Sequence, residues 1–153
     1  MRDVFVGVLF AIALFMFSYR GYERRDEVAG KLACCFAIGV ALFPEPSKVP
    51  WVPRVHYAFA AGLFLTFSYF SMCLFTKTRK DRQPTERKRW RNRVYVACGV
   101  AMLAFIGLIG LYSLLWEKTR VAQLNPVFWL ESLAMWAFGI SWGVKGEAIL
   151  KDN

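Results

Sequence analysis

The sequence predicts an all-α fold, a polytopic transmembrane helical bundle with about five spans. Hydrophobic residues make up 57% of the 153 residues, and the mean hydropathy is +0.35, which is more apolar than usual for a soluble domain of this size. The aromatic residues include six Trp, and Trp is enriched where membrane meets water. Nine Lys and Arg residues lie between Phe75 and Val94, with a long apolar run on each side. Such a cluster is typical of a cytoplasmic loop joining two membrane spans.

Five apolar runs are the expected spans, and they predict a single transmembrane domain over residues 1–153. The first two have 16 residues each, or about 24 Å of helix at 1.5 Å per residue. The third and fourth meet the roughly 20-residue length of a spanning helix, and the fifth is interrupted by Glu131. A backbone in hydrocarbon must satisfy its own hydrogen bonds, so each run is expected to be helical. The runs are residues 4–19, 28–43, 55–75, 94–116 and 127–144.

The fourth helix is expected to begin before its apolar run does. Pro84, Thr85 and Glu86 precede the charged stretch, and threonine is a favourable N-cap residue. We therefore predict that this helix starts near Glu86 and stands above the membrane before entering it.

The distribution of Lys and Arg predicts the orientation. With the basic loop inside, 15 of the 20 Lys and Arg residues lie on the cytoplasmic side. The expected protein is therefore a multi-pass protein of the cell inner membrane, with its amino terminus outside and its carboxyl terminus in the cytoplasm. Because the charge lies between apolar runs rather than over a folded surface, we expect no nucleic-acid partner.

The basic loop itself predicts contact with lipid. Anionic headgroups of the cytoplasmic leaflet attract such segments by about 1 kcal/mol for each Lys or Arg near the surface. Binding of a regulatory protein is the alternative role. The residues expected to contact headgroups are Arg87, Lys88, Arg89, Arg91 and Arg93.

A second candidate site lies at the outer ends of the spans. A carboxylate inside a span, such as Glu131, costs free energy unless it is paired, hydrogen-bonded or hydrated. The predicted topology brings His56, the sole histidine, to the same outer level, together with Asp3, Arg54 and Tyr112. These five residues form either a structural cluster, a pocket for a ligand or lipid headgroup, or a catalytic pair. In the catalytic alternative His56 is the general base and Glu131 orients it.

Sequence motifs for cofactors and metals are missing. The four Cys residues lack metal-ligand spacing, and no motif of a nucleotide-binding protein, serine hydrolase or zinc protease is present. We therefore expect no cofactor and no metal site.

Small residues in the spans predict how the helices pack. Gly139 and Gly143 have G-x-x-x-G spacing in the fifth span, which lets helix backbones approach closely in lipid. Two alternatives remain, namely packing within the bundle and homodimerisation through this face.

Several segments resemble a family of uncharacterised small bacterial multi-span inner-membrane proteins, a domain of unknown function. The resemblance implies a bacterial inner-membrane helical protein and names no reaction. The family pattern also implies a further span ahead of Met1, which this sequence does not contain. The segments that carry the resemblance are Met1–Gly7, Tyr19–Asp26, Ala41–Pro44, Phe75–Thr78, Arg91–Gly99 and Trp129–Ser132.

The predicted function is that of a non-enzymatic multi-pass membrane protein that binds lipid, a small hydrophobic ligand or a membrane partner, a second copy of itself included. One alternative is an outer-leaflet lipid-modifying enzyme that uses His56 and Glu131. Another is a small transporter or channel subunit with Glu131 as a relay. The expected partners are membrane lipids, with anionic headgroups at the cytoplasmic loop.

Overall fold

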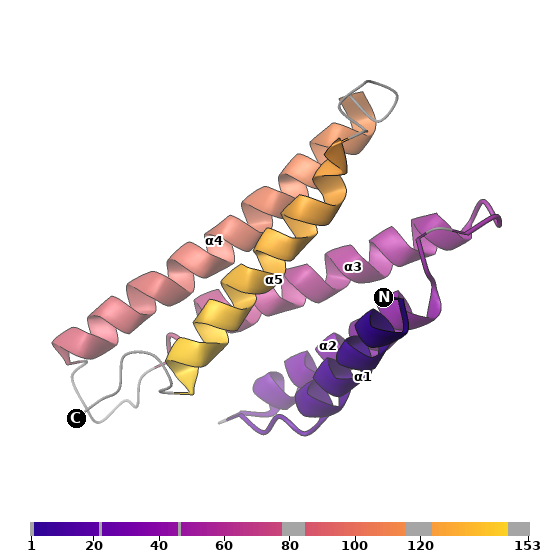
Figure 1. The fold of residues 1–153 in the computed structure, drawn as a ribbon. Coiled ribbons are helices and arrows are strands. Elements are labelled where there is room, and N and C mark those ends of the chain that lie inside the picture. Colours follow the sequence, from indigo (N-terminus) through magenta and orange to yellow (C-terminus); the bar gives the residue numbers. More distant parts are fainter. Residues whose placement is uncertain (1, 22, 46, 78–84, 116–123, 147–153) are drawn as a thin grey trace. The chain divides into compact units, whose positions relative to one another are not determined.

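The structure is a computed structural model that describes residues 2–21, 23–45, 47–77, 85–115 and 124–146. In these ranges the chain forms helices and no strands, which confirms the predicted all-α class. In chain order the elements are α1 (Arg2–Phe17), α2 (Arg24–Leu42), α3 (Val52–Tyr69), the π-helical segment η1 (Phe70–Leu74), α4 (Glu86–Leu115) and α5 (Pro126–Lys145) (Figure 1).

Within the described ranges, three helical stretches are long and apolar enough to cross a membrane. They are Val52–Leu74, Glu86–Leu115 and Pro126–Lys145, with 23, 30 and 20 residues. The first of them runs through α3 into η1. By contrast, α1 is apolar but has 16 residues, and α2 begins with four charged residues. A membrane-spanning role for α1 and α2 therefore stays a prediction.

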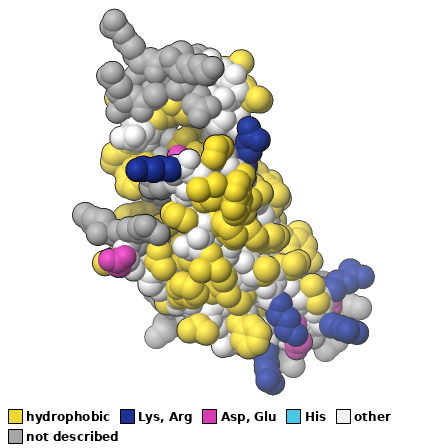
Figure 2. Space-filling view, turned by 90° about the vertical axis from the view of Figure 1, so that its right-hand side faces the viewer, with side chains coloured by type: hydrophobic (Ala, Val, Ile, Leu, Met, Phe, Trp, Pro, Cys, Tyr) yellow, Lys and Arg dark blue, Asp and Glu magenta, His cyan; other side chains and the backbone are white. Residues whose placement is uncertain are grey.

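The surface carries many large apolar side chains, as expected where lipid is the solvent. The side chains of Leu114 and Trp136 are 83% and 73% exposed. Figure 2 shows hydrophobic side chains gathered in a broad patch, with the Lys and Arg side chains of that face at its margins. Apolar patches of this kind are typical of surfaces that contact a membrane or another protein.

Two helix starts can be compared with the sequence. The helix α4 begins at Glu86, and the Lys88 N–H donates to Thr85 Oγ1 at 3.2 Å, which confirms the predicted N-cap. The helix α3 begins at Val52, three residues earlier than predicted, because Pro53 lies inside its first turn. Proline is tolerated there, since the first N–H groups of a helix have no intrahelical partner.

The chain divides into two compact units, Met1–Thr66 and Phe67–Asn153, and the boundary falls inside α3. The prediction of a single domain over residues 1–153 stays a prediction.

In the first unit, α1 and α2 lie side by side (Figure 1). Ala29, Ala33 and Ala37 are all buried and recur every four residues along α2. Next to this row, a Cβ added to Gly30 would lie 2.7 Å from the carbonyl oxygen of Met16. Small residues thus let the two backbones approach closely. In lipid the hydrophobic effect does not drive helices together, so such close packing contributes to their association.

The contact between α2 and the first turns of α3 uses glycine and phenylalanine on both sides. A Cβ on Gly39 would lie 2.3 Å from the Phe59 ring, and one on Gly62 would lie 2.7 Å from the Phe36 ring. Each ring therefore occupies space that the glycine opposite leaves open. The Phe59 ring also stacks on Phe43, with the ring centroids 5.8 Å apart.

The second unit is held by buried hydroxyl contacts and aromatic rings. The hydroxyl oxygens of Ser71 and Ser141 lie 2.8 Å apart, and Ser68 Oγ donates to the carbonyl oxygen of Gly99 at 2.8 Å. Interhelical hydrogen bonds of this kind help to hold helices together in lipid. A connected cluster of rings packs in the same unit: Phe67, Phe70, Phe75, Tyr95, Phe138 and Trp142.

Candidate functional site

The basic residues at the start of α4 divide between two faces of the helix. Lys88 and Arg91 lie on the face that packs against neighbouring helices of the second unit, where Arg91 is buried. Arg87, Arg89 and Arg93 are exposed. Lys88 and Arg91 are three residues apart and Arg89 and Arg93 are four apart, so each pair shares a face. Arg87 is exposed but lies four residues before Arg91, on that side of the helix rather than on the side of Arg89 and Arg93.

Arg91 does not face lipid headgroups, contrary to the prediction. Its side chain is only 6% exposed. One guanidinium nitrogen donates to the carbonyl oxygens of Val144 at 3.0 Å and of Lys145 at 3.5 Å, and Nε donates to the Tyr95 hydroxyl at 3.3 Å. The last carbonyls of a helix have no intrahelical donor, and a cation there also suits the negative end of the helix dipole. Arg91 therefore caps the carboxyl end of α5.

Lys88 has a similar role at the end of η1. Its Nζ donates to the carbonyl oxygen of Phe75 at 2.9 Å and lies 5.6 Å from the centroid of the Tyr95 ring. Phe75 is the residue that follows η1, so this carbonyl is another end group that needs a donor. Lys88 is half-buried, and its ammonium binds a helix end rather than facing outward as predicted.

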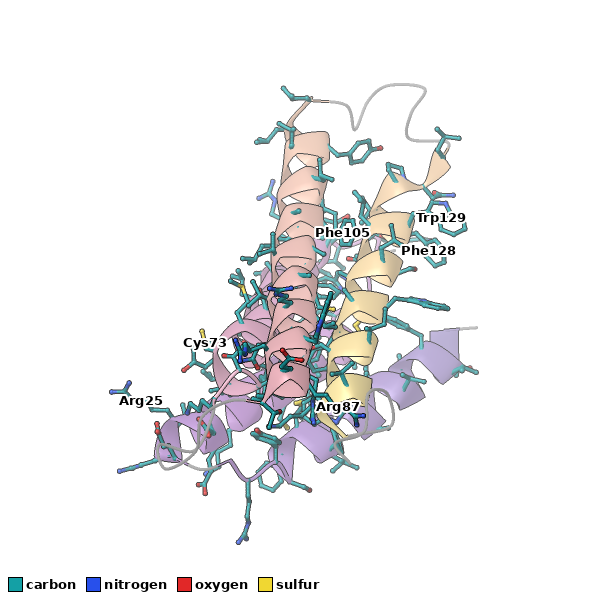
Figure 3. The ribbon with its side chains drawn as sticks, turned by 90° about the vertical axis from the view of Figure 1, so that its left-hand side faces the viewer. Arg25, Cys73, Arg87, Phe105, Phe128 and Trp129 are labelled. Carbon is teal, nitrogen blue, oxygen red and sulfur yellow. The ribbon has the colours of Figure 1, made fainter. Side chains whose placement is uncertain are left out.

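The exposed face of the same turns has the composition of a membrane-interface anchor. Trp90 is 62% exposed, and the Arg93 guanidinium lies over its ring at 5.1 Å from the centroid. Figure 3 shows Arg87 at the amino-terminal end of α4, while Phe128 and Trp129 lie at the opposite end of the α4–α5 pair. Aromatic side chains are enriched at both membrane interfaces and basic ones at the cytoplasmic side.

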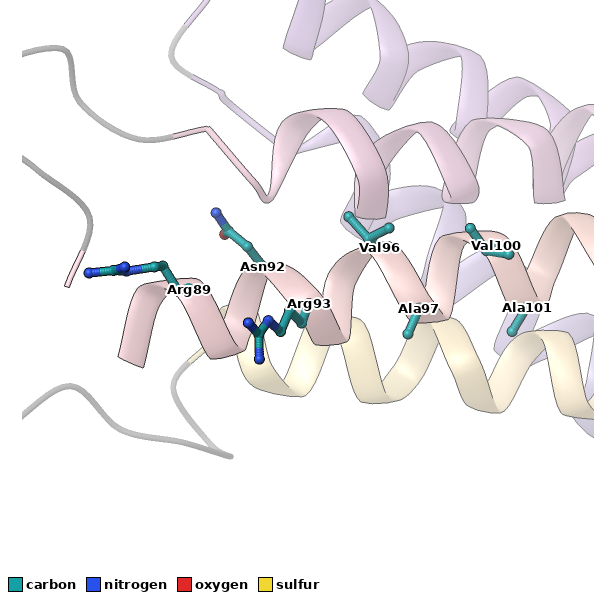
Figure 4. Close-up of a pocket in the computed structure, with 7 residues that line it drawn as sticks. All are labelled: Arg89, Asn92, Arg93, Val96, Ala97, Val100 and Ala101. Carbon is teal, nitrogen blue, oxygen red and sulfur yellow. The ribbon is translucent and has the colours of Figure 1, made fainter. Parts of the chain in front are cut away.

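A groove of about 790 Å³ runs along this outward face, and we call it the α4 groove. Its polar end is formed by Arg89, Asn92 and Arg93, and small apolar side chains line the turns that follow (Figure 4). The groove thus combines cations at one end with an apolar wall along the rest. The apolar lining residues are Val96, Ala97, Val100 and Ala101.

Asn92 carries an unsatisfied group next to the α4 groove. Its side-chain oxygen Oδ1 is buried and, among the residues that the structure describes, has no hydrogen-bond donor. Most buried polar atoms are hydrogen-bonded, and because this oxygen is buried it is not open to a molecule in the groove.

The predicted outer cluster is distributed over both units. Asp3, Arg54 and His56 belong to the first unit, and Tyr112 and Glu131 belong to the second. Asp3 and Arg54 are exposed, whereas Tyr112 and Glu131 are half-buried. The predicted convergence of these five side chains stays a prediction.

His56 is buried, and its ring has a clear structural contact. The Nδ1 atom lies 2.7 Å from the carbonyl oxygen of Phe43, the residue that follows α2. Because a carbonyl only accepts hydrogen bonds, Nδ1 is the donor in this contact. The imidazole thus ties the end of α2 to the first turns of α3, which favours the structural alternative for this residue.

The glycine spacing of α5 makes no close contact at Gly139 with the part of the chain that the structure describes. Gly139 is exposed, and a Cβ added there would meet nothing within 4 Å. Packing of Gly139 against another part of the bundle stays a prediction. Homodimerisation through the face that Gly139 shares with Gly143 stays a prediction.

Across the described ranges, no group of three or more His, Cys, Asp or Glu side chains has the arrangement of a metal site. The expectations of no metal and no cofactor concern the whole chain, including residues outside the described ranges, and they stay predictions.

Sequence reasoning missed Asn92 and the four apolar residues of the groove. A helical count from Arg89 would have found them, because positions 89, 93, 96, 97 and 100 share one face. The face of α4 that packs against neighbouring helices could also have been found from the sequence. Its residues recur at alternating spacings of three and four, namely Lys88, Arg91, Tyr95, Cys98 and Met102.

Comparisons of the chain with protein-family models, with curated proteins and with solved structures found no match. The resemblance to small bacterial inner-membrane proteins therefore stays a prediction.

Proposed function

We propose that this chain is a non-enzymatic multi-pass protein of the bacterial inner membrane that binds anionic lipid at the basic end of α4. The observation that carries the proposal is the outward face of that helix end. There the exposed Arg89 and Arg93 lie beside an exposed Trp90, at the start of a helix long and apolar enough to cross a membrane.

Electrostatics favours this role over a purely structural one. Lys88 and Arg91 have partners at helix ends, whereas Arg89 and Arg93 are exposed on the opposite side of the helix. Each Lys or Arg near an anionic leaflet contributes about 1 kcal/mol. Arg89 and Arg93 together then contribute up to about 2 kcal/mol, or roughly thirtyfold in affinity.

The contact of His56 supports the non-enzymatic part of the proposal. The lipid-modifying alternative requires Nε2 of this imidazole to reach a substrate, whereas the residue is only 8% exposed and its Nδ1 donates to the Phe43 carbonyl 2.7 Å away. The hydrogen bond from His56 to the carbonyl at the end of α2 gives this histidine a structural role, because that carbonyl has no donor within its own helix.

The test compares lipid binding by the wild-type protein and two triple variants purified in a neutral detergent. Arg87→Gln/Arg89→Gln/Arg93→Gln removes the exposed charges of α4, and Arg20→Gln/Arg24→Gln/Arg25→Gln removes three exposed charges before and in α2. We expect the first variant to lose at least tenfold in affinity for phosphatidylglycerol over phosphatidylcholine, and the second to lose much less. Equal losses in both variants would refute a specific role for α4.

A further inference from the structure

Within the proposed lipid-binding function, on which this inference depends, we infer that the α4 groove is a site for one anionic phospholipid, with its phosphate at the arginines and an acyl chain along the groove. The groove offers the two chemical features that such a molecule matches, namely cations at one end and an apolar wall along the rest.

The phosphate position follows from the two arginines. Arg89 and Arg93 are four residues apart on one helix face, with Asn92 beside them (Figure 4). Guanidinium groups donate in a planar fork that suits phosphate oxygens. The Trp90 ring supports the Arg93 guanidinium at 5.1 Å, which limits the number of conformations in which this cation faces the groove.

The acyl chain position follows from the small apolar residues. Val96, Ala97, Val100 and Ala101 line the turns that lead away from the arginines. From Asn92 to Ala101 the helix rises about 14 Å, close to the roughly 15 Å of hydrocarbon in one leaflet. A lipid with its phosphate at the arginines therefore has its chain along these four side chains.

The experiment measures lipid adducts of the full chain by native mass spectrometry, with phosphatidylglycerol as the probe. We expect the wild type to retain one phosphatidylglycerol. Arg89→Gln/Arg93→Gln and the groove-filling Ala97→Trp should each weaken retention at least tenfold. The matched controls are Arg24→Gln/Arg25→Gln on α2 and Leu108→Trp, at an exposed α4 position outside the groove, and these should bind as the wild type does.

The outcomes separate this inference from the proposed function. If the exposed arginines are needed for anionic lipid but Ala97→Trp binds like Leu108→Trp, the lipid-binding function stands and the groove site is wrong. Binding of glycerol phosphate as tight as that of phosphatidylglycerol would also overturn the site, because the apolar wall would then contribute nothing. If wild-type protein shows no anionic preference, both ideas fail together.

Discussion

At the scale of single residues, Arg91 shows how a side chain in a basic cluster acquires a structural role. Its neighbours Arg89 and Arg93 are exposed, whereas the Arg91 guanidinium is buried against the carbonyl oxygens of Val144 and Lys145. Buried charges are tolerated when their donors are satisfied. The cation and the last turn of α5 therefore depend on each other.

We expect Arg91→Ala to destabilise the protein by about 2 kcal/mol, because hydrogen bonds to charged groups contribute about 1.5–3 kcal/mol each and the carbonyls lose their donor. Arg89→Ala, at an exposed position of the same helix end, should change stability by less than about 0.5 kcal/mol. Thermal unfolding in detergent, followed by tryptophan fluorescence, measures both. Equal midpoints for the two variants would contradict the capping role.

At the scale of elements, the α1–α2 pair depends on close approach of two backbones. The contact is closest at Gly30, where an added Cβ would lie 2.7 Å from the carbonyl oxygen of Met16. A backbone atom cannot move aside as a flexible side chain can, so the helices themselves would have to separate.

Two glycine-to-alanine substitutions test this contact, and their expected effects have opposite signs. Gly30→Ala should destabilise the protein by about 1–3 kcal/mol through overpacking. Gly7→Ala lies in α1 with nothing within 4 Å of the added Cβ and should be neutral or stabilising by up to about 1 kcal/mol, because alanine is the better helix former. The unfolding midpoints of the two variants in one detergent decide the matter. A Gly30→Ala protein as stable as Gly7→Ala would rule out the close approach.

At the scale of the whole molecule, orientation decides which face meets which leaflet. The proposed orientation puts the basic end of α4 in the cytoplasm and the segment before α3 outside. Lys48 and Glu86 are exposed residues of these two regions, and a cysteine at either position reports the side on which it lies.

We expect Lys48→Cys, in a variant whose four native cysteines are replaced by alanine, to react with a membrane-impermeant maleimide added to spheroplasts. Glu86→Cys in the same background should react only after the membrane is permeabilised. The measurement is the mass shift of the purified protein. The reverse pattern would invert the proposed orientation and move the groove to the opposite leaflet.

Much of the architecture followed from hydropathy and helix signals alone. In the part of the chain that the structure describes, α-helices form where the five apolar runs predict them, and α4 begins at Glu86 with Thr85 as its cap. These features are local, because a helix in lipid satisfies its own backbone and a cap involves residues three positions apart. The predicted start of α3 was three residues too late because of Pro53. A proline can lie either at the end of a loop or in the first turn of a helix, and the sequence alone does not distinguish these positions.

The sequence by itself determined the all-α class, the helices and the concentration of positive charge before the fourth apolar run, because each depends on neighbouring residues. Only the tertiary structure decided which cations are available to a ligand. Lys88 and Arg91 have the same chemistry as Arg89 and Arg93, but the partners of the first two, Phe75 and Val144, are distant in sequence. The same packing leaves Asn92 Oδ1 buried without a donor among the described residues, a property of surroundings rather than of residue type.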